Sequence, residues 1–311
     1  MKKVITINDP NEKLKEIDQL INTVFNGFMA VAMDYGYHIN NVFGSSEIEK
    51  QKIYELRDNM SYRLRSSKLH FYLLLRRKIE TEHRFAEMLK NDPQVFSGFY
   101  SGNPHFEFAA DEIMGIYDSI IFHLSSSFDY LAMLIQFVFG DNPQKKLQWI
   151  TLAKLCYSKD SEYQKRMFKV NIQNVDRDFV SKFNDYRAEL IHRKKSTSYA
   201  NVTWELHSGK VETNFVCSEN IKTHLKKIIN KDNEYCITYV SYEAIKQTVM
   251  NIANVLEGIN SEFRTNYNPR SPVMNGGAQI ISISEGSPFA ESPSLGYWNE
   301  FLKYKNTDNS K

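Results

Sequence analysis

The sequence contains few of the residues and patterns that identify common protein classes. Its three cysteines, Cys156, Cys217 and Cys236, are odd in number and far apart. This argues for a reducing compartment and against a disulfide framework or a zinc site. The formal net charge is only +2. A strongly basic coat for nucleic acid is therefore not indicated, and a polyanion would have to bind at a local cluster of cations.

The chain also lacks a long hydrophobic run. The longest apolar stretch, from Tyr130 to Phe139, is interrupted by Gln136. It is far shorter than the ~20 residues that span a bilayer. The N-terminal MKKVITINDPNEK has two lysines but no apolar core of a signal peptide. These features predict a soluble, cytoplasmic protein that is not bound to a membrane.

The motifs of several large enzyme classes are missing as well. We find no glycine-rich phosphate loop, no dinucleotide fingerprint and no nucleophile elbow. The eight histidines are not combined with carboxylates at the spacing of metal ligands. We therefore expect neither a metal nor a cofactor. Parallel-strand runs are also lacking, which disfavours an α/β enzyme core.

The patterns that are present are mostly helical. Asp9, Pro10 and Glu12 form a helix start in which Asp9 is the cap and Pro10 takes the first position. A second helical stretch, roughly 46 to 90, could be one helix or two. The turn-rich segment from Asn91 to Pro104 is the best internal boundary. The clearest helix follows, because apolar residues recur in it at steps of three and four: Ile113, Tyr117, Ile120, Leu124, Phe128, Leu131, Ile135 and Val138.

The second half of the chain adds shorter helices and a hairpin. We expect helices at 144 to 156, 161 to 173, 219 to 230 and 241 to 265. A further helix before residue 193 carries Phe179, Phe183, Tyr186 and Leu190 on one face. The segments NVTWEL and VETNFVC alternate like strands around HSGK, which predicts a β-hairpin that turns at Gly209.

The predicted fold is mainly α, a helical bundle with an N-terminal helical extension, a small β-hairpin insertion and an irregular C-terminal tail. We expect an N-terminal helical region at 1–95 and a bundle at 104–265 with the hairpin at about 199–217. Residues 266–311 are rich in Pro, Gly, Ser and Asn, which predicts a largely disordered tail. Within it, QIISIS is a candidate strand and YWNEFLKY a candidate helix.

Three arginine–histidine pairs have a similar spacing. Arg187 and His192, in DYRAELIHRKK, are separated by four residues, as are Arg65 and His70, and Arg77 precedes His83 by six positions. Such spacing arises about once by chance in a chain of this composition, so context must decide. The first two pairs lie in a long amphipathic stretch, where a structural role is favoured.

The third pair differs in its context. It lies at the C-terminal end of a helix with an aromatic stripe, and it follows a long apolar helix that could form the other half of a bundle core. The cations Arg193, Lys194 and Lys195 follow His192 directly. They concentrate positive charge where a phosphate backbone could bind, so we take them as candidate substrate-binding residues.

The segments FDYLA at 128 to 132 and FNDYRAELIHR at 183 to 193 resemble the HEPN superfamily. Its members are all-α bundles with an arginine, four to six residues and then a histidine near the end of a helix. The resemblance covers roughly residues 106 to 265 and matches Arg187 and His192 to the motif. The family often has Asn, Asp or His directly after the arginine, whereas this chain has Ala188.

The resemblance implies a metal-independent endoribonuclease of a bacterial defence or toxin–antitoxin system. It implies catalytic roles for Arg187 and His192, RNA as substrate, and a site completed in a homodimer. An antitoxin or regulatory protein is an implied partner. The chemistry agrees in outline, because histidine suits acid–base work near neutral pH and arginine suits a phosphate that gains charge.

Helix geometry restricts how the two motif residues could cooperate. Residues five apart on an α-helix lie ~140° apart around its axis. Arg187 and His192 therefore do not share a face. We expect the helix to be distorted at His192, the long arginine to reach around the helix, or a second protomer to supply the partner group.

Other side chains are weaker candidates. Glu189 could hold His192 or Arg193, although a surface ion pair is the simpler interpretation. His123 and Ser127 could face the same cleft or act as hydrogen-bonding groups between helices. We expect Tyr186 in the core, and Trp204 in the hairpin could either stack on a base or pack.

Two further hypotheses stand beside the ribonuclease. The first, favoured by Ala188 and the near-neutral charge, is a non-catalytic HEPN-like module that binds RNA, a nucleotide or a partner protein. The second is a helical scaffold without chemistry, which is compatible with the N-terminal helices and the long tail. A scaffold predicts that Arg187 and His192 lie far apart in bulk solvent.

Overall fold

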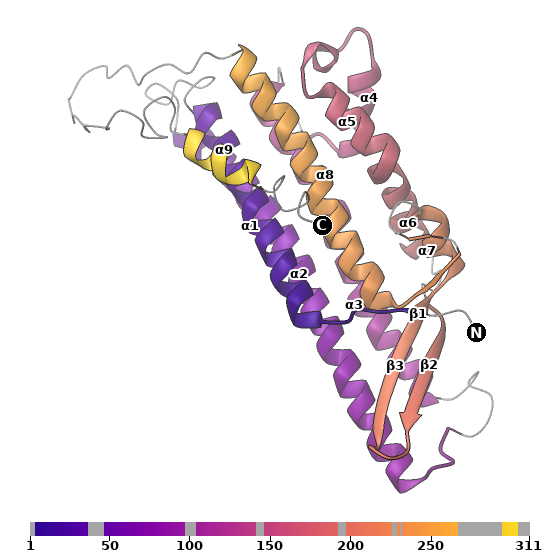
Figure 1. Ribbon diagram of the computed structural model, residues 1–311. Helices are drawn as coiled ribbons and strands as arrows, with labels where there is room; N and C mark the ends of the chain where they lie inside the picture. The colour runs from indigo at the N-terminus through magenta and orange to yellow at the C-terminus, as the bar shows by residue number, and fades with distance from the viewer. Residues whose placement is uncertain are drawn as a thin grey trace, which may run out of the picture. The chain divides into compact units, whose positions relative to one another are not determined.

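The computed structural model is mainly α-helical with a small antiparallel hairpin, as predicted (Figure 1). It describes residues 4–36, 47–96, 104–140, 146–191, 197–225, 229–230, 232–266 and 294–303. The chain divides into two compact units. Unit 1 comprises residues 1–18, 64–126 and 178–248, and unit 2 comprises residues 19–63, 127–177 and 249–311. Each unit therefore takes residues from both of the predicted segments, 1–95 and 104–265.

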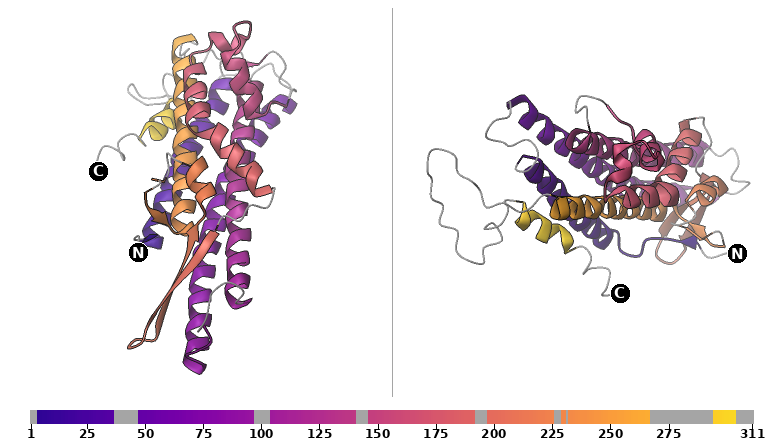
Figure 2. Two further views of the ribbon diagram at one scale, coloured as in Figure 1. Left: turned by 90° about the vertical axis from the view of Figure 1, so that its right-hand side faces the viewer. Right: turned by 90° about the horizontal axis from the view of Figure 1, so that it is seen from above.

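Four helices are long (Figures 1 and 2). Each contributes residues to both units. They are α1 (Pro10–Asp34), α2 (Glu47–Asn91), α3 (Pro104–Phe139) and α8 (Ile237–Asn266). The stretch predicted as one helix or two is the single helix α2. The predicted cap of α1 is confirmed, because Asp9 Oδ1 accepts hydrogen bonds from the backbone N–H groups of Asn11 and Glu12, at 2.9 and 3.0 Å.

Unit 1 contains the predicted hairpin, formed by β2 (Thr197–Glu205) and β3 (Lys210–Cys217). Gly209 closes the turn with a φ of 68°, which lies in the left-handed region that glycine tolerates best. The hairpin lies beside the C-terminal part of α2 (Figures 1 and 2). The backbone N–H of Thr213 donates to Glu82 Oε1 at 2.8 Å, and this bond fixes β3 to α2.

The remaining elements of unit 1 are short. A parallel pair joins β1 (Val4–Ile5) to β4 (Glu234–Tyr235). The helix α6 (Ser181–Ile191) carries Arg187 of the arginine–histidine motif. The helix α7 (Glu219–His224) begins where the 219–230 helix was predicted to begin but ends six residues before residue 230. The apolar stripe of α3 is confirmed as core, and the fully buried residues of unit 1 include Phe71, Ile113, Tyr117, Ile120, Leu124, Phe183 and Ile245.

Unit 2 contains helices that are shorter than the sequence predicts. The expected helices at 144–156 and 161–173 are α4 (Trp149–Tyr157), a 3-10 turn at Glu162–Lys165 and α5 (Lys169–Val175). Trp149 explains where α4 begins. Its backbone N–H donates to Asp129 Oδ1 at 3.0 Å and its indole Nε1 donates to Asp176 Oδ1 at 2.8 Å. A π-helical segment, Asp176–Val180, joins α5 to α6.

The predicted C-terminal helix exists as α9 (Leu295–Leu302). It is attached within unit 2 by the buried Asp34, which accepts hydrogen bonds from Ser294 Oγ and, at 2.6 Å, from Trp298 Nε1. Burial raises the pKa of Asp34 to about 6, although both donors and the charge of Arg264 act in the opposite direction. The candidate strand QIISIS lies outside the described residues.

The helix α3 is long and apolar enough to cross a membrane by length and composition, alone among the helices in the described ranges. Most of its apolar window is buried within the structure. The central helix of a protein that never enters a membrane has the same properties.

Candidate functional site

The structure describes one of the two predicted catalytic residues. Arg187 lies near the C-terminal end of α6 in unit 1. His192 and the predicted substrate-binding residues Arg193, Lys194 and Lys195 lie outside the described residues. The described part of the candidate site therefore consists of Arg187 and its neighbours.

Arg187 is held against α3 by two contacts. Its Nη1 donates to Ser125 Oγ at 3.3 Å, and Ser125 Oγ donates in turn to Asn184 Oδ1 at 2.8 Å. Its guanidinium carbon lies 5.3 Å from the centre of the Phe122 ring, within the range of a cation–π interaction. The side chain is therefore placed by a hydroxyl and an aromatic ring.

These contacts leave at least one N–H donor of the Arg187 guanidinium without an acceptor among the described residues. Its Nε is buried and has no hydrogen-bond acceptor among the described residues. No carboxylate in the described ranges pairs with it. Arginine has five N–H donors in a planar fork that fits phosphate and carboxylate groups. An anion could therefore still bind to Arg187 without displacing an ion pair.

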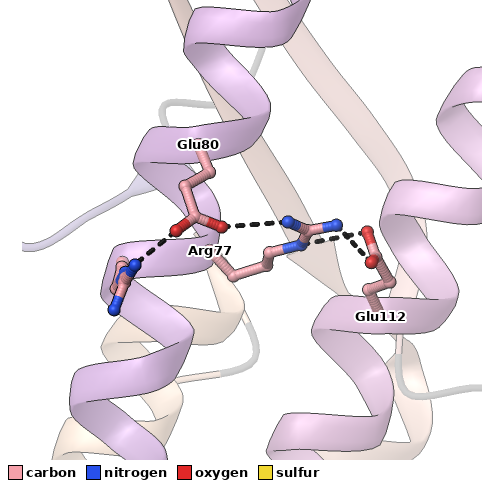
Figure 3. A network of polar contacts seen from close by, with 4 residues as sticks. Arg77, Glu80 and Glu112 are labelled. Carbon is pink, nitrogen blue, oxygen red and sulfur yellow. Dashed lines mark hydrogen bonds and ion pairs between the residues drawn. The ribbon is translucent and has the colours of Figure 1, made fainter.

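The arginine of another pair, Arg77 on α2, is arranged differently (Figure 3). Its Nε donates to Glu112 Oε2 at 3.0 Å, its Nη2 donates to Glu112 Oε1, and its Nη1 donates to Glu80 Oε2 at 2.9 Å. The carboxylates of Glu112 and then Glu80 raise the pKa of Arg77. Since its donors are occupied, Arg77 connects α2 to α3 and has a structural role, as the sequence suggested.

The histidine of the remaining pair has a neighbour that the sequence did not predict. His70 on α2 lies 5.1 Å, between ring centres, from His123 on α3. Its Nδ1 lies 2.8 Å from the carbonyl oxygen of Ser66, so this nitrogen carries the proton in the neutral ring. His123 also lies 5.6 Å from the Phe122 ring. Phe122 thus contacts Arg187 and one imidazole, His123, which in turn contacts His70.

A second feature that the sequence analysis missed is the pair of Glu189 and His224. Glu189 lies two residues after Arg187 on α6, and its Oε1 lies 3.1 Å from Nε2 of His224 on α7. The ring of His224 also lies 6.0 Å from that of Tyr186, which is buried as predicted. The expected partners of Glu189, His192 and Arg193, lie outside the described residues. A carboxylate that orients an imidazole is an arrangement suited to acid–base chemistry.

Two of the weaker candidates, Ser127 and Trp204, differ in how deeply they are buried. Ser127 is fully buried, and it belongs to unit 2, whereas Arg187 belongs to unit 1. Trp204 is half-buried and pairs with Val211 across the hairpin. Within the described ranges, no group of three or more His, Cys, Asp or Glu side chains could hold a metal ion.

Comparisons with known proteins add no further information on this site. No family model matches the sequence, no curated protein is similar to it at a significant level, and no solved structure matches the fold significantly.

Proposed function

We propose that this protein is a HEPN-like, metal-independent endoribonuclease in which Arg187 binds the scissile phosphate of RNA. The observation that carries the proposal is the state of Arg187. It lies in the RAELIH segment, it is half-buried, and among the described residues it has a hydroxyl and an aromatic ring as partners but no carboxylate. An arginine in this state suits a phosphate that gains negative charge.

The reaction is a transesterification that needs no cofactor. A base removes the proton of the ribose 2′-OH, the oxygen attacks phosphorus, and the 5′-oxygen leaves with a proton from an acid. The products are a 2′,3′-cyclic phosphate and a free 5′-OH. His192 is the proposed acid–base residue, Arg187 stabilises the charge on phosphorus, and Arg193, Lys194 and Lys195 bind the RNA backbone.

The spacing of the motif favours a site shared by two protomers. Residues five positions apart lie ~140° apart on a regular helix, so a regular helix would not place Arg187 and His192 on the same face. We propose a homodimer in which each protomer supplies part of the site. A cytoplasmic role in bacterial defence, with an antitoxin or regulatory protein as partner, completes the proposal.

The test is cleavage of a labelled RNA by purified full-length protein in excess EDTA. We expect R187A and H192A to lose cleavage by a factor of roughly 100 or more each. The double variant H83A/R84A is a matched control, because it removes an adjacent histidine and a half-buried arginine from α2. Cleavage by R187A/H192A at the parental rate would overturn the proposal, as would an equal loss in the control.

Ala188 favours a second candidate, an RNA-binding module without catalysis. Ala188 directly follows Arg187, at a position where HEPN proteins often have Asn, Asp or His. Because alanine has no polar side chain, the site has one fewer group for proton transfer than those proteins. This candidate predicts RNA binding that weakens steeply with salt and depends on Arg187, without cleavage. Metal-independent cleavage that is lost in R187A would exclude it.

A further inference from the structure

A row of planar side chains lies around Phe122 on α3. Phe122 is 44% exposed, although it is a large apolar residue. The Arg187 guanidinium lies 5.3 Å from its ring on the α6 side, and the His123 ring lies 5.6 Å from it. His70, on α2, follows at 5.1 Å from His123. Three helices of unit 1 thus bring a guanidinium, a phenyl ring and two imidazoles into one continuous series of contacts.

These four groups share properties that suit a nucleobase. Each has a flat face, and unpaired bases stack on aromatic rings and on guanidinium planes. None of them carries a negative charge at neutral pH. Arg187 adds a donor fork that can hold a phosphate next to a stacked base. A single exposed phenyl ring needs no explanation by itself, but this combination of neighbours fits an anionic, aromatic ligand.

We propose that Phe122 is a stacking platform for an unpaired base of single-stranded RNA, with Arg187 on the adjacent phosphate. The rings of His123, tilted by 71° from Phe122, and of His70, tilted by 37° from His123, lie beside this platform. The identity of the polymer rests on the proposed function, and the platform gives that function a substrate class. Duplex RNA does not fit, because its base faces are covered by their neighbours in the stack.

The experiment measures the binding of an uncleavable 2′-O-methyl single-stranded oligoribonucleotide to the full-length protein by fluorescence anisotropy. F122L removes the aromatic face and keeps apolar bulk, and we expect it to weaken binding roughly tenfold. F122W keeps an aromatic face and should bind like the parent. Since Phe122 is exposed, both variants should fold, which a thermal melt would check.

Phe108 provides a matched control on the same helix. It is 55% exposed, and the guanidinium carbon of Arg84 lies 5.6 Å from its ring. The guanidinium carbon of Arg84 also lies 5.7 Å from the centre of the Phe85 ring, so it is close to two phenyl rings. F108L therefore removes an exposed ring beside an arginine without touching the planar row. It should leave the affinity for the oligoribonucleotide unchanged.

An abasic version of the same oligonucleotide separates stacking from other contacts. Without bases, the parent and F122L should bind equally, whereas R187A should still weaken binding. A duplex of the same sequence should be insensitive to F122L. The proposal is overturned if F122L binds the single strand like the parent, which would mean that Phe122 faces another kind of partner, or if it weakens abasic binding equally.

Failure of this inference can be distinguished from failure of the proposed function, because the probe cannot be cleaved. If F122L weakens single-strand binding while R187A/H192A still cleaves RNA at the parental rate, the platform stands and the ribonuclease assignment fails. If cleavage depends on Arg187 and His192 but F122L binds normally, the ribonuclease stands and the platform fails.

Discussion

Two arginines of unit 1 occupy opposite environments. Arg77 connects α2 to α3 through a two-point contact with Glu112 and a further bond to Glu80 (Figure 3). Arg187 connects α6 to α3 through one hydroxyl and one phenyl ring, and its buried Nε has no acceptor in the described ranges. Both belong to arginine–histidine pairs in the sequence. The comparison teaches that the partners of an arginine, rather than its spacing to a histidine, indicate whether it can bind an anion.

A third set of charged contacts in unit 1, around Glu16, is expected to contribute more to folding stability than those of the two arginines. Glu16 on α1 contacts Lys13 at 2.9 Å and Lys246 on α8 at 3.1 Å. Burial acts to raise its pKa, but hydrogen bonds from Tyr242, Lys13 and Lys246 outweigh burial and lower the pKa to about 2. The folded state therefore prefers the ionised carboxylate, whose stabilisation is present above the ordinary pKa of 4.5.

We predict that E16Q removes about 2 kcal/mol of stability at pH 7 and flattens the acid side of the stability profile. In the parent, this contribution is lost as the pH falls from about 4.5 towards 2, and in E16Q it is already missing. Urea unfolding from pH 7 to pH 3 measures both effects, with the exposed Glu87→Gln as control. Parallel profiles for the parent and E16Q would contradict this account.

The Arg77 contacts should stabilise the fold more weakly, because both partners are partly exposed. We expect R77A to reduce the free energy of unfolding by about 1 kcal/mol. Its neighbour Arg76 is 64% exposed and pairs within one helix, so R76A should cost less than about 0.5 kcal/mol. Chemical denaturation of both variants measures the difference. If R76A were the more destabilising, the connecting role of Arg77 would be wrong.

A further small effect is predicted for the coupling between Arg187 and Phe122. A double-mutant cycle with R187A and F122L should give about 0.5 kcal/mol in unfolding free energy, since the cation–π pair is partly exposed. A cycle with R84A and F108L gives the matched value for the other pair on α3. A coupling of ~2 kcal/mol or more at Arg187 would show that this arginine is a structural element like Arg77, and the comparison would fail.

The local features of the fold could be predicted from the sequence because they depend on nearby residues. The cap at Asp9, the apolar stripe of α3, the turn at Gly209 and the helix α9 all follow from spacing and residue type within about one or two turns. The irregular stretch from 158 to 180 could not be predicted in this way. Its helices are limited by tertiary contacts, such as the bond from Trp149 to Asp176.

The surroundings of the candidate site could not be predicted for the same physical reason. Arg187 contacts Ser125, which lies 62 positions away in the sequence, and Glu189 contacts His224, which lies 35 positions away. Local periodicity in the sequence does not indicate such pairs. The sequence selected Arg187 by its context at the end of a striped helix, but it assigned no neighbour to His70 or His123. The role of Phe122 came only from the structure, because no local sequence pattern predicts that its ring is exposed and lies between Arg187 and His123 in the series of contacts.

The most direct test of the central claim is the single-turnover rate of RNA cleavage in EDTA for R187A and R77A, each measured where the variant is fully folded. The account predicts a loss of roughly 100-fold or more for R187A and a rate within about twofold of the parent for R77A. Equal rates for R187A and the parent, or an equal loss in both variants, would contradict it.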